Sequence, residues 1–319
     1  MGDARGASHA SLGPMDRAKR EWPTWLALVV CYALWGLTVA YHPILGWWVI
    51  VPGAVLVAFH SSLQHEILHG HPTRSAALNE ALVFPALGLF IPYRRFRDLH
   101  LKHHNDERLT DPFDDPESFY LAEADWQCRC GLMRTLLAAN ATLAGRMLIG
   151  PAMAMWGFWR SELRLIAGGD EAVRGAWTRH MLGVALVLAM VWWAGMAIWV
   201  YIALAAYPGM SLIMIRSFIE HRAAETAPQR TAVIEAGWFW RLLYLNNNYH
   251  SVHHAYPAMA WYLLPSRWRA EREHVLRRNG GYLLPGYGAV FRRWFLKGRE
   301  PVIHPLLYRD DAARGLDER

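Results

Sequence analysis

Four long apolar runs limit what this chain can fold into more than any other feature. They cover about residues 24–41, 44–63, 181–200 and 202–219, and each is close to the roughly 20 residues that an α-helix needs to cross a bilayer. The first pair is joined at His42-Pro43, and the second pair near or slightly before Tyr207-Pro208-Gly209. The sequence therefore predicts an all-α integral membrane protein whose four transmembrane helices form two hairpins.

The rest of the chain is predicted to lie in water or at the membrane surface. Although 54% of the residues are hydrophobic, the mean hydropathy is only +0.05, so a sizeable water-facing part accompanies the spans. Two shorter apolar stretches, 76–93 and 132–159, are interrupted by charges and prolines. Such interruptions favour interfacial or re-entrant helices over full spans.

We expect a single domain over residues 1–319 with its polar regions on one side of the membrane. These regions are a histidine-rich helical cap at 64–180 and 220–305 and flexible tails at 1–20 and 306–319. The basic residues of the cap stand beside Trp, Leu and Tyr rather than in a stripe of the kind that binds nucleic acid. The positive-inside rule then places the cap in the cytoplasm, at a bacterial inner membrane. These basic residues are Arg94, Arg95, Arg97, Lys102, Arg267, Arg269, Arg272, Arg277, Arg278, Arg292 and Arg293.

The N-terminus and the cysteines add two smaller expectations. The first apolar run follows a basic segment, residues 17–20, and lacks a small-residue cleavage site, so it is predicted to remain as a span rather than be removed as a signal peptide. The three cysteines, Cys31, Cys128 and Cys130, provide no disulfide framework and indicate a reduced compartment.

Eight histidines stand in three tight clusters, each at helical spacing. Positions i, i+3 and i+4 share one face of a helix, so each cluster is predicted to direct its imidazoles at a single place from a rigid backbone. One cluster could arise by chance or in core packing, but three in one chain indicate metal binding. The clusters are His65 with His69, His100 with His103 and His104, and His250 with His253 and His254.

A ninth histidine and the number of imidazoles indicate two metal ions. His221 stands where the last apolar run ends, on the same predicted side as the clusters, so we expect it to be a further ligand. Nine imidazoles are too many for one zinc ion, which takes four ligands at most. Imidazole suits iron, copper and zinc, and no thiolates are placed to select copper(I) or an iron–sulfur cluster. A pair of histidine-bound irons would suit the activation of oxygen, which zinc cannot perform.

At these residues the chain resembles the membrane fatty acid desaturase and hydroxylase superfamily, which carries three histidine boxes on a four-span helical scaffold. The three clusters match the boxes in order, His221 matches an extra ligand near the last span, and the resemblance extends to about Pro305. Segments 106–118 and 245–257 are similar to bacterial members that include carotenoid ketolases and amino-acid-derivative desaturases. Ser217 stands where some members carry an asparagine that contacts the metal through water.

This resemblance implies a membrane-bound, non-haem di-iron oxidoreductase. Such an enzyme uses O2 and external electrons to desaturate an acyl or other lipophilic chain. The donor would be ferredoxin-, flavodoxin- or cytochrome-like, since no fused electron carrier is expected, and an acidic donor would suit the basic cap. Hydroxylation or carotenoid ketolation is the alternative outcome, because the choice depends on how the substrate is held beside the metals.

Polar residues near the boxes are candidates to orient the imidazoles through their second nitrogens. Each carboxylate among them is equally compatible with a solvated loop charge. The carboxylates among them are Glu66, Asp106, Asp111, Asp114, Asp115, Glu117 and Glu220, and the other candidates are His71 and Asn247. The histidines away from box spacing are expected to be dispensable, namely His9, His42, His180, His274 and His304.

Two features are predicted to lie at the membrane surface. Residues 261–278 are expected to form an amphipathic, arginine-rich cap at the level of the lipid headgroups that roofs the site. Five tryptophans are expected to anchor or pack the spans, and they are Trp47, Trp48, Trp192, Trp193 and Trp199.

Two other classes of protein remain open. Residues 65–69 read His-Glu-Ile-Leu-His, the H-E-x-x-H motif in which zinc metalloproteases use two histidine ligands and a glutamate base. A metalloprotease site of this kind would give the other two histidine clusters no function. A metal transporter or haem-binding membrane protein would need ionisable groups within the spans, where this chain has almost none.

Overall fold

The computed structural model describes residues 21–105 and 108–307 of the chain. Within them the protein is predominantly helical, and its helices include four that are long and apolar enough to cross a membrane: Trp22–Ala40, His42–Leu68, Glu171–Trp193 and Ile198–Glu220. The predicted all-α, four-span membrane architecture is confirmed. The predicted tails at 1–20 and from 308 onward, and the candidate Asp106, lie outside the described residues.

The first hairpin carries the first histidine cluster at its end. It consists of α2 (Trp22–Ala40), α3 (His42–Leu45), the 3₁₀ turn η1 (Gly46–Val49) and α4 (Ile50–Leu68). Helix α4 continues five residues beyond the predicted end of its apolar run at residue 63. His65 therefore lies on the last turn of the helix, and His69 follows as its C-terminal cap.

The second hairpin turns earlier than the sequence predicted. It consists of α11 (Glu171–Trp193), α12 (Ile198–Tyr201), the π-helical turn η2 (Ile202–Ala206) and α13 (Tyr207–Glu220). The turn lies at residues 194–197, where Gly195 has a φ of 79° that favours glycine. The predicted join, near Tyr207-Pro208-Gly209 or slightly before it, is placed too late, because the π-helical turn accommodates the missing N–H of the proline and the helix continues.

Close contact between α4 and α13 explains the role of Gly209. A Cβ atom on Gly209 would lie 2.6 Å from the Cβ of Val57, and one on Gly53 would lie 2.9 Å from the Cβ of Ala205. Small residues let two membrane helices approach each other closely. The ends of α4 and α13, which carry the first cluster and His221, are thereby held together.

Shorter helices fill the space between and after the hairpins. The segment between them contains α5 (Ala76–Leu82), α6 (Tyr93–Asn105), α7 (Glu123–Gln127), α8 (Gly131–Asn140), α9 (Leu143–Leu148) and α10 (Gly150–Ala167). The C-terminal part contains η3 (Ala227–Arg230), β1 (Val233–Ile234), α14 (Trp238–Leu243), α15 (His250–Ala255), α16 (Leu264–Arg278), β2 (Leu283–Leu284) and α17 (Tyr287–Trp294). Strands β1 and β2 form a short parallel pair.

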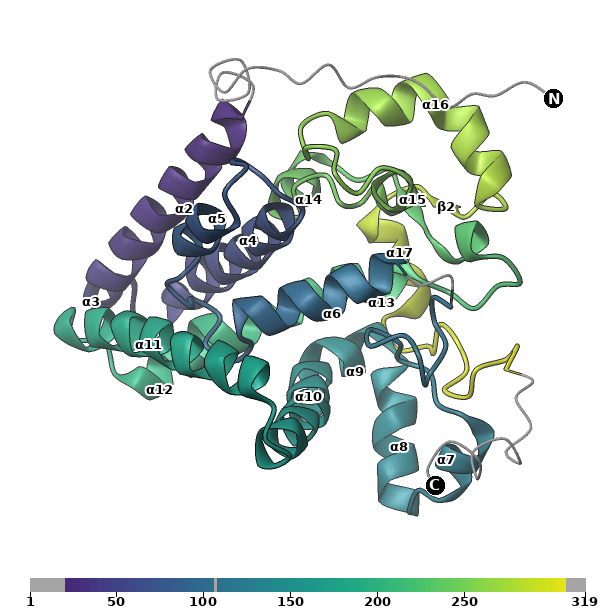
Figure 1. The fold of residues 1–319 in the computed structure, drawn as a ribbon, viewed down its shortest axis with the longest axis horizontal. Coiled ribbons are helices and arrows are strands. Elements are labelled where there is room, and N and C mark those ends of the chain that lie inside the picture. Colours follow the sequence, from purple (N-terminus) through teal and green to yellow (C-terminus); the bar gives the residue numbers. More distant parts are fainter. Residues whose placement is uncertain (1–20, 106–107, 308–319) are drawn as a thin grey trace.

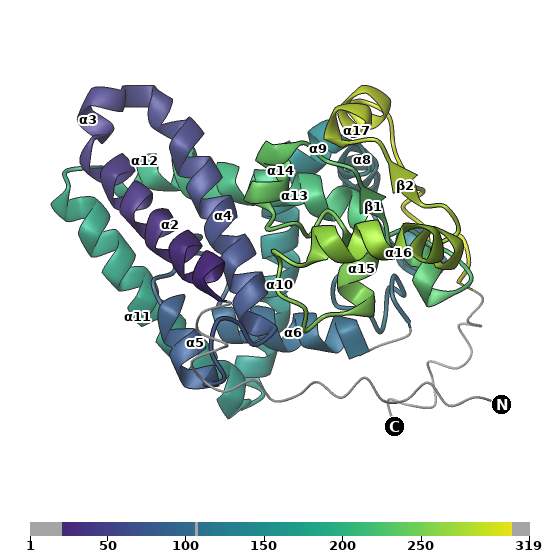
Figure 2. The same ribbon diagram turned by 90° about the horizontal axis from the view of Figure 1, so that it is seen from above.

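The arrangement places the hairpins at one end of the molecule and the C-terminal elements at the other. Helix α6 passes through the middle of the view in Figure 1, near α13. In Figure 2, α2, α4 and α11 occupy one end, and α15, α16 and α17 the opposite end. The histidine-bearing helices α4, α6, α13 and α15 therefore meet where the spans join the remainder of the chain.

The exposed tryptophans mark the far ends of the hairpins. Trp47 and Trp48 lie at the turn of the first hairpin, and Trp192, Trp193 and Trp199 flank the turn of the second. Their side chains are between 61% and 85% exposed, which suits contact with lipid rather than with the core. These turns lie at the opposite ends of α4 and α13 from the histidines.

Candidate metal centre

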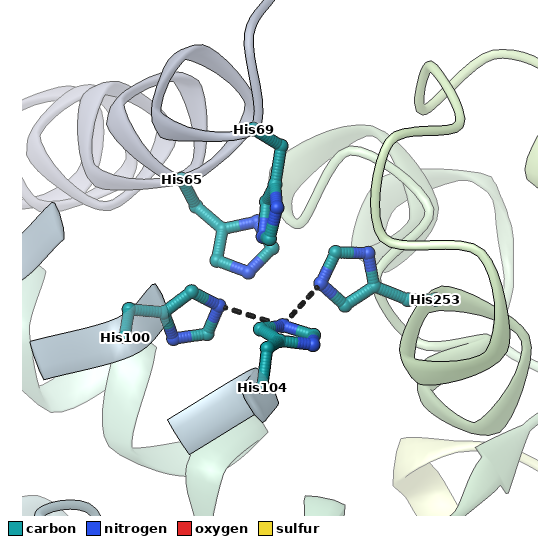
Figure 3. Close-up of side chains that lie close together, drawn as sticks. All are labelled: His65, His69, His100, His104 and His253. Carbon is teal, nitrogen blue, oxygen red and sulfur yellow. Dashed lines mark hydrogen bonds between the residues drawn. The ribbon is translucent and has the colours of Figure 1, made fainter. Parts of the chain in front are cut away.

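The nine predicted ligands lie together in two groups. His65, His69, His100, His104 and His253 form the first group, shown in Figure 3. His103, His221, His250 and His254 form the second. Within each group, one ligand atom from every side chain lies within 4.8 Å of the others. The four segments that supply them are separated widely in the sequence and meet only in the folded chain.

The second and third clusters are each divided between the two groups. On α6, His100 and His104 face the first group, and His103 faces the second. On α15 the assignment is reversed, since His250 and His254 face the second group and His253 the first. The prediction that each cluster serves a single place is therefore wrong for these two clusters. The i and i+4 positions share a helix face, whereas the i+3 position is displaced enough to reach the neighbouring group.

The nitrogen positions in the second group suit a bound cation. Nδ1 of His103 lies 2.8 Å from a carboxylate oxygen of Asp115, and Nδ1 of His250 lies 3.1 Å from the amide oxygen of Asn247. In the neutral form of both rings, Nδ1 therefore carries the proton and Nε2 offers a lone pair. These lone pairs face Nε2 of His221 at 3.1 and 2.9 Å. His221 can donate only one proton there, so at least one contact joins two lone pairs. A bound cation removes this conflict.

The first group shows the same arrangement around His104. Nδ1 of His100 donates to Glu117 at 2.7 Å, and its Nε2 lies 3.0 Å from Nε2 of His104. Nε2 of His253 also lies 3.0 Å from Nε2 of His104. Figure 3 shows both contacts as dashed lines. The buried Nε2 atoms of His65 and His69 have no hydrogen-bond partner among the described residues. Unpartnered, converging nitrogens are the arrangement that a metal ion requires.

The protonation of the histidines also fits metal binding. Burial lowers the pKa of His69 and of His221 to about 3, with further lowering by neighbouring histidines, so both imidazoles are neutral at physiological pH. Burial likewise holds the pKa of His250, His253 and His254 well below the ordinary value. Neutral imidazole is the form that binds metals.

His103 differs from the other histidines because carboxylates surround it. Burial lowers its pKa, but the negative charges of Glu117 and Asp115 outweigh burial and raise the pKa to about 9. These same charges would stabilise a metal ion bound to His103, since a cation can replace the proton. The carboxylate charges near His103 therefore favour a cation in the second group.

The number of imidazoles in the first group favours a metal with more than four ligands. Five imidazoles converge there, one more than a structural zinc site uses. Within the two groups, five Nε2···Nε2 contacts measure 2.9–3.1 Å.

Two of the predicted supporting residues contact His250. Nδ1 of His250 lies 3.1 Å from Asn247 and 3.3 Å from a carboxylate oxygen of Glu220. Asn247 also donates its side-chain N–H to Glu220 at 3.4 Å. Ser217, near the end of α13, donates its hydroxyl to the backbone carbonyl of Met214 and not to a histidine.

The other described candidates lie outside the two groups. His71 binds Glu21 through Nδ1 at 2.8 Å and lies 3.2 Å from the carbonyl of Ala258 through Nε2. Asp111 accepts backbone N–H groups of Phe113 and Asp114 and so closes a turn. The imidazoles on α6 are held by Asp115 and Glu117, two of the carboxylates that the sequence offered as candidates from the same acidic segment. Spacing alone could not choose among the carboxylates of an irregular loop.

Glu66 is placed for a structural role rather than for acid–base catalysis. Its carboxylate accepts the backbone N–H of Trp261 at 3.1 Å and lies 3.9 Å from Nε2 of His71. It therefore joins the first cluster to the segment that follows the third. A metalloprotease needs this carboxylate beside a metal-bound water. In this structure the glutamate of the H-E-x-x-H motif instead contacts Trp261 and His71.

A cavity lined by both polar and apolar residues reaches the two groups from the side of α16. Its volume is about 510 Å³, and His104 of the first group and His254 of the second form part of its wall. The rings of these two histidines stack with centroids 4.2 Å apart. Tyr256, Glu271 and Arg278 line the cavity further out. The predicted arginine-rich cap thus lies over this cavity.

Comparison with known proteins agrees with this site. The family model for fatty acid desaturases matches residues 45–285, so the chain belongs to the fatty acid desaturase family. It is an integral membrane oxidoreductase of the desaturase and oxygenase type. The chain is also similar to the beta-carotene ketolase of Paracoccus sp. (strain N81106 / MBIC 01143), with 27% identity over 171 residues. This match covers 50% of the chain and 67% of the ketolase.

Proposed function

We propose that this protein is a di-iron enzyme that uses O2 and external electrons to oxidise a lipophilic chain, with desaturation as the primary reaction. The observation that carries the proposal is the convergence of nine imidazoles into two adjacent groups at the end of four membrane-length helices. Two bound irons would supply the activation of O2 and the oxidation of a substrate C–H bond. All nine histidines would serve as ligands.

The protein's own residues hold the ligands and shield them from bulk water. Asp115 and Glu117 fix the ring orientation of His103 and His100 through their Nδ1 atoms, and Asn247 does so for His250. Such partners increase the basicity of a ligating imidazole and fix its tautomer. Most of the nine rings are buried, which limits the loss of a reactive oxidant to solvent.

The position of the centre supports a lipophilic substrate and a separate electron donor. The first group lies at the end of α4, which is part of a membrane-length helix, so a chain dissolved in the membrane can approach from the spans. The 510 Å³ cavity reaches the two groups from the side of α16. We assign that side to the cytoplasm because the basic residues gather there. An acidic ferredoxin-, flavodoxin- or cytochrome-like donor would complement the exposed Arg269, Arg277 and Arg278.

Ketolation is the second candidate reaction. The similarity to a beta-carotene ketolase favours it, although only half of this chain takes part in the match. Both reactions begin with hydrogen removal from a methylene group. They differ in whether the neighbouring carbon is also oxidised or whether oxygen is transferred, and this depends on the position of the substrate.

Expression in a bacterial host lacking related genes tests the proposal. The purified protein should contain about two irons per chain by metal analysis after iron-replete growth. Membranes should consume O2 only with a reductant and a lipophilic substrate. Mass spectrometry should show a product lighter by two hydrogens for desaturation, or a carbonyl product from carotenoids for ketolation. One zinc per chain and no iron would contradict the proposal.

A further inference from the structure

A small cavity away from the histidines is lined by two buried arginines. It lies between α8, α9, the end of α13 and residues 299–302, and its volume is about 20 Å³. That is enough for one group of water size. The cavity wall includes the polar residues Arg146, Arg299, Asn140 and Glu300, together with Phe119 and Phe218.

Arg146 lacks an acidic partner among the described residues. Its residue surface is only 8% exposed, and its Nε donates to the carbonyl of Asn140 at 3.1 Å. Its two terminal nitrogens make no hydrogen bond to any described residue, so four N–H donors remain for the cavity. The guanidinium carbon lies 5.0 Å from the ring centre of Phe119 and 5.9 Å from that of Phe218. The rings attract the charge but accept none of its in-plane N–H groups.

Arg299 places a second positive charge at the same rings. Its guanidinium carbon lies 5.3 Å from the ring centre of Phe119, and its side chain is 3% exposed. It donates to the hydroxyl of Tyr282 and to the backbone carbonyl of His221. Burial and the charge of Arg299 together lower the pKa of Arg146 to about 10. Two buried like charges without compensation are costly.

The surrounding groups leave one positive charge unbalanced. Glu300 lies 3.9 Å from Arg299 and can balance only one of the two arginines. The side-chain oxygen of Asn140 is buried and has no partner among the described residues. An amide is assigned its orientation from its hydrogen bonds, so Asn140 can also turn its N–H groups toward the cavity. The site therefore offers N–H donors and one net positive charge.

We propose that this cavity binds a small anionic group, either a halide ion or one terminal oxygen of a phosphate. The proposal is independent of the oxidation reaction. The group could be a free ion or part of an anionic lipid headgroup. Leu132 on α8 and Leu148 on α9 are each 71% exposed on two of the helices that border the cavity. Because Arg299 also holds the carbonyl of His221, the anion stabilises the segment that carries this ligand.

Thermal unfolding of the full chain in detergent tests the proposal without reference to activity. The protein is purified in gluconate buffer, and tryptophan fluorescence follows unfolding while sodium chloride, sodium bromide or sodium phosphate replaces gluconate at constant ionic strength. A separate series compares micelles of phosphatidylcholine with micelles that contain phosphatidylglycerol. Saturating ligand should raise the midpoint by about 3–6 °C. A response to the salts indicates a free anion, and a response to phosphatidylglycerol alone indicates a headgroup.

Three variants identify the site. Arg146→Met keeps the length of the side chain and removes its charge, so it should abolish the response. Arg164→Met makes the same change at an exposed position on α10 and should retain it. Asn140→Asp supplies a built-in carboxylate, so it should unfold at a higher temperature in gluconate and no longer respond. If Arg146→Met does not fold, the response of Asn140→Asp to the salts and lipids tests the proposal instead. A full response in Asn140→Asp, or no response of the unmodified chain to any salt or lipid, overturns the proposal in favour of a cavity that holds only water.

Discussion

The Nε2 atoms of His103 and His221 lie 3.1 Å apart although 118 residues separate them in the sequence. This contact joins α6 to the end of the fourth span. It also assigns His221 to the same group as His103, His250 and His254. His221 therefore has the environment of a metal ligand, with its ring buried among other imidazoles, rather than that of a histidine at a helix end.

Replacement of His221 should affect one metal ion more than the other. His221→Ala removes a ligand of the second group only, so metal analysis should show a fall from about two irons per chain to about one. Turnover should fall to background, because the reaction needs both ions. His42→Ala lies at the opposite end of the spans and should keep both ions and full turnover. Equal metal content in both variants would contradict the assignment of His221.

The carboxylate behind His103 should control metal affinity. Asp115 is buried, and it binds Nδ1 of His103 and the backbone N–H of Thr110. Asp115→Asn should weaken metal binding by about 10–100-fold, because the amide cannot accept both hydrogen bonds without turning its N–H group toward one donor. Competition with a chelator measures the change.

Asp111→Asn is the matched comparison from the same acidic segment. It keeps the oxygen that accepts the turn N–H groups of Phe113 and Asp114. Metal affinity should therefore change less than about twofold. A loss as large as that of Asp115→Asn would show that Asp111, as the sequence suggested, also supports the centre.

The Glu66→Gln variant distinguishes the proposed O2-dependent di-iron enzyme from a zinc metalloprotease. Gln keeps an oxygen that can accept the N–H of Trp261, so both irons should remain and turnover should fall by less than about tenfold, a loss of under about 1.4 kcal/mol in transition-state stabilisation. A metalloprotease would lose its general base and essentially all activity. Activity and iron content are measured on the same sample. Complete inactivity with full iron content would argue against the proposed di-iron enzyme.

Reporter fusions test the assigned orientation. Fusions after Asp125 and after Asn279 should both report the cytoplasm, whereas a fusion at His42 should report the opposite side. The reason is that the start of α2 and the end of α4 meet through Glu21 and His71, so these ends share one side. A non-cytoplasmic signal after Asp125 would reverse the proposed topology and place the donor on the other face.

The sequence determined most of the membrane fold but misplaced one turn. Runs of apolar residues identify spans because the bilayer core excludes unpaired polar groups, and all four were found. The turn of the second hairpin was expected near Pro208 and Gly209, since both residues commonly end helices. In the structure the π-helical turn before Pro208 and the packing of Gly209 on Val57 keep the helix intact. Neither effect is visible without the neighbouring helix α4.

By itself, the sequence identified the nine histidines that gather in the fold, and it predicted that they bind two metal ions. Helical spacing is a local property, so His65 with His69 and the two longer clusters could be recognised one at a time. Only the tertiary structure decided how the ligands are shared. His103 and His253 each belong to a different group from the other histidines of their own cluster. Asp115 and Glu117 orient the rings of His103 and His100 on α6. These choices depend on how α6, α13 and α15 cross, and the crossing is set by packing between segments that are distant in the sequence.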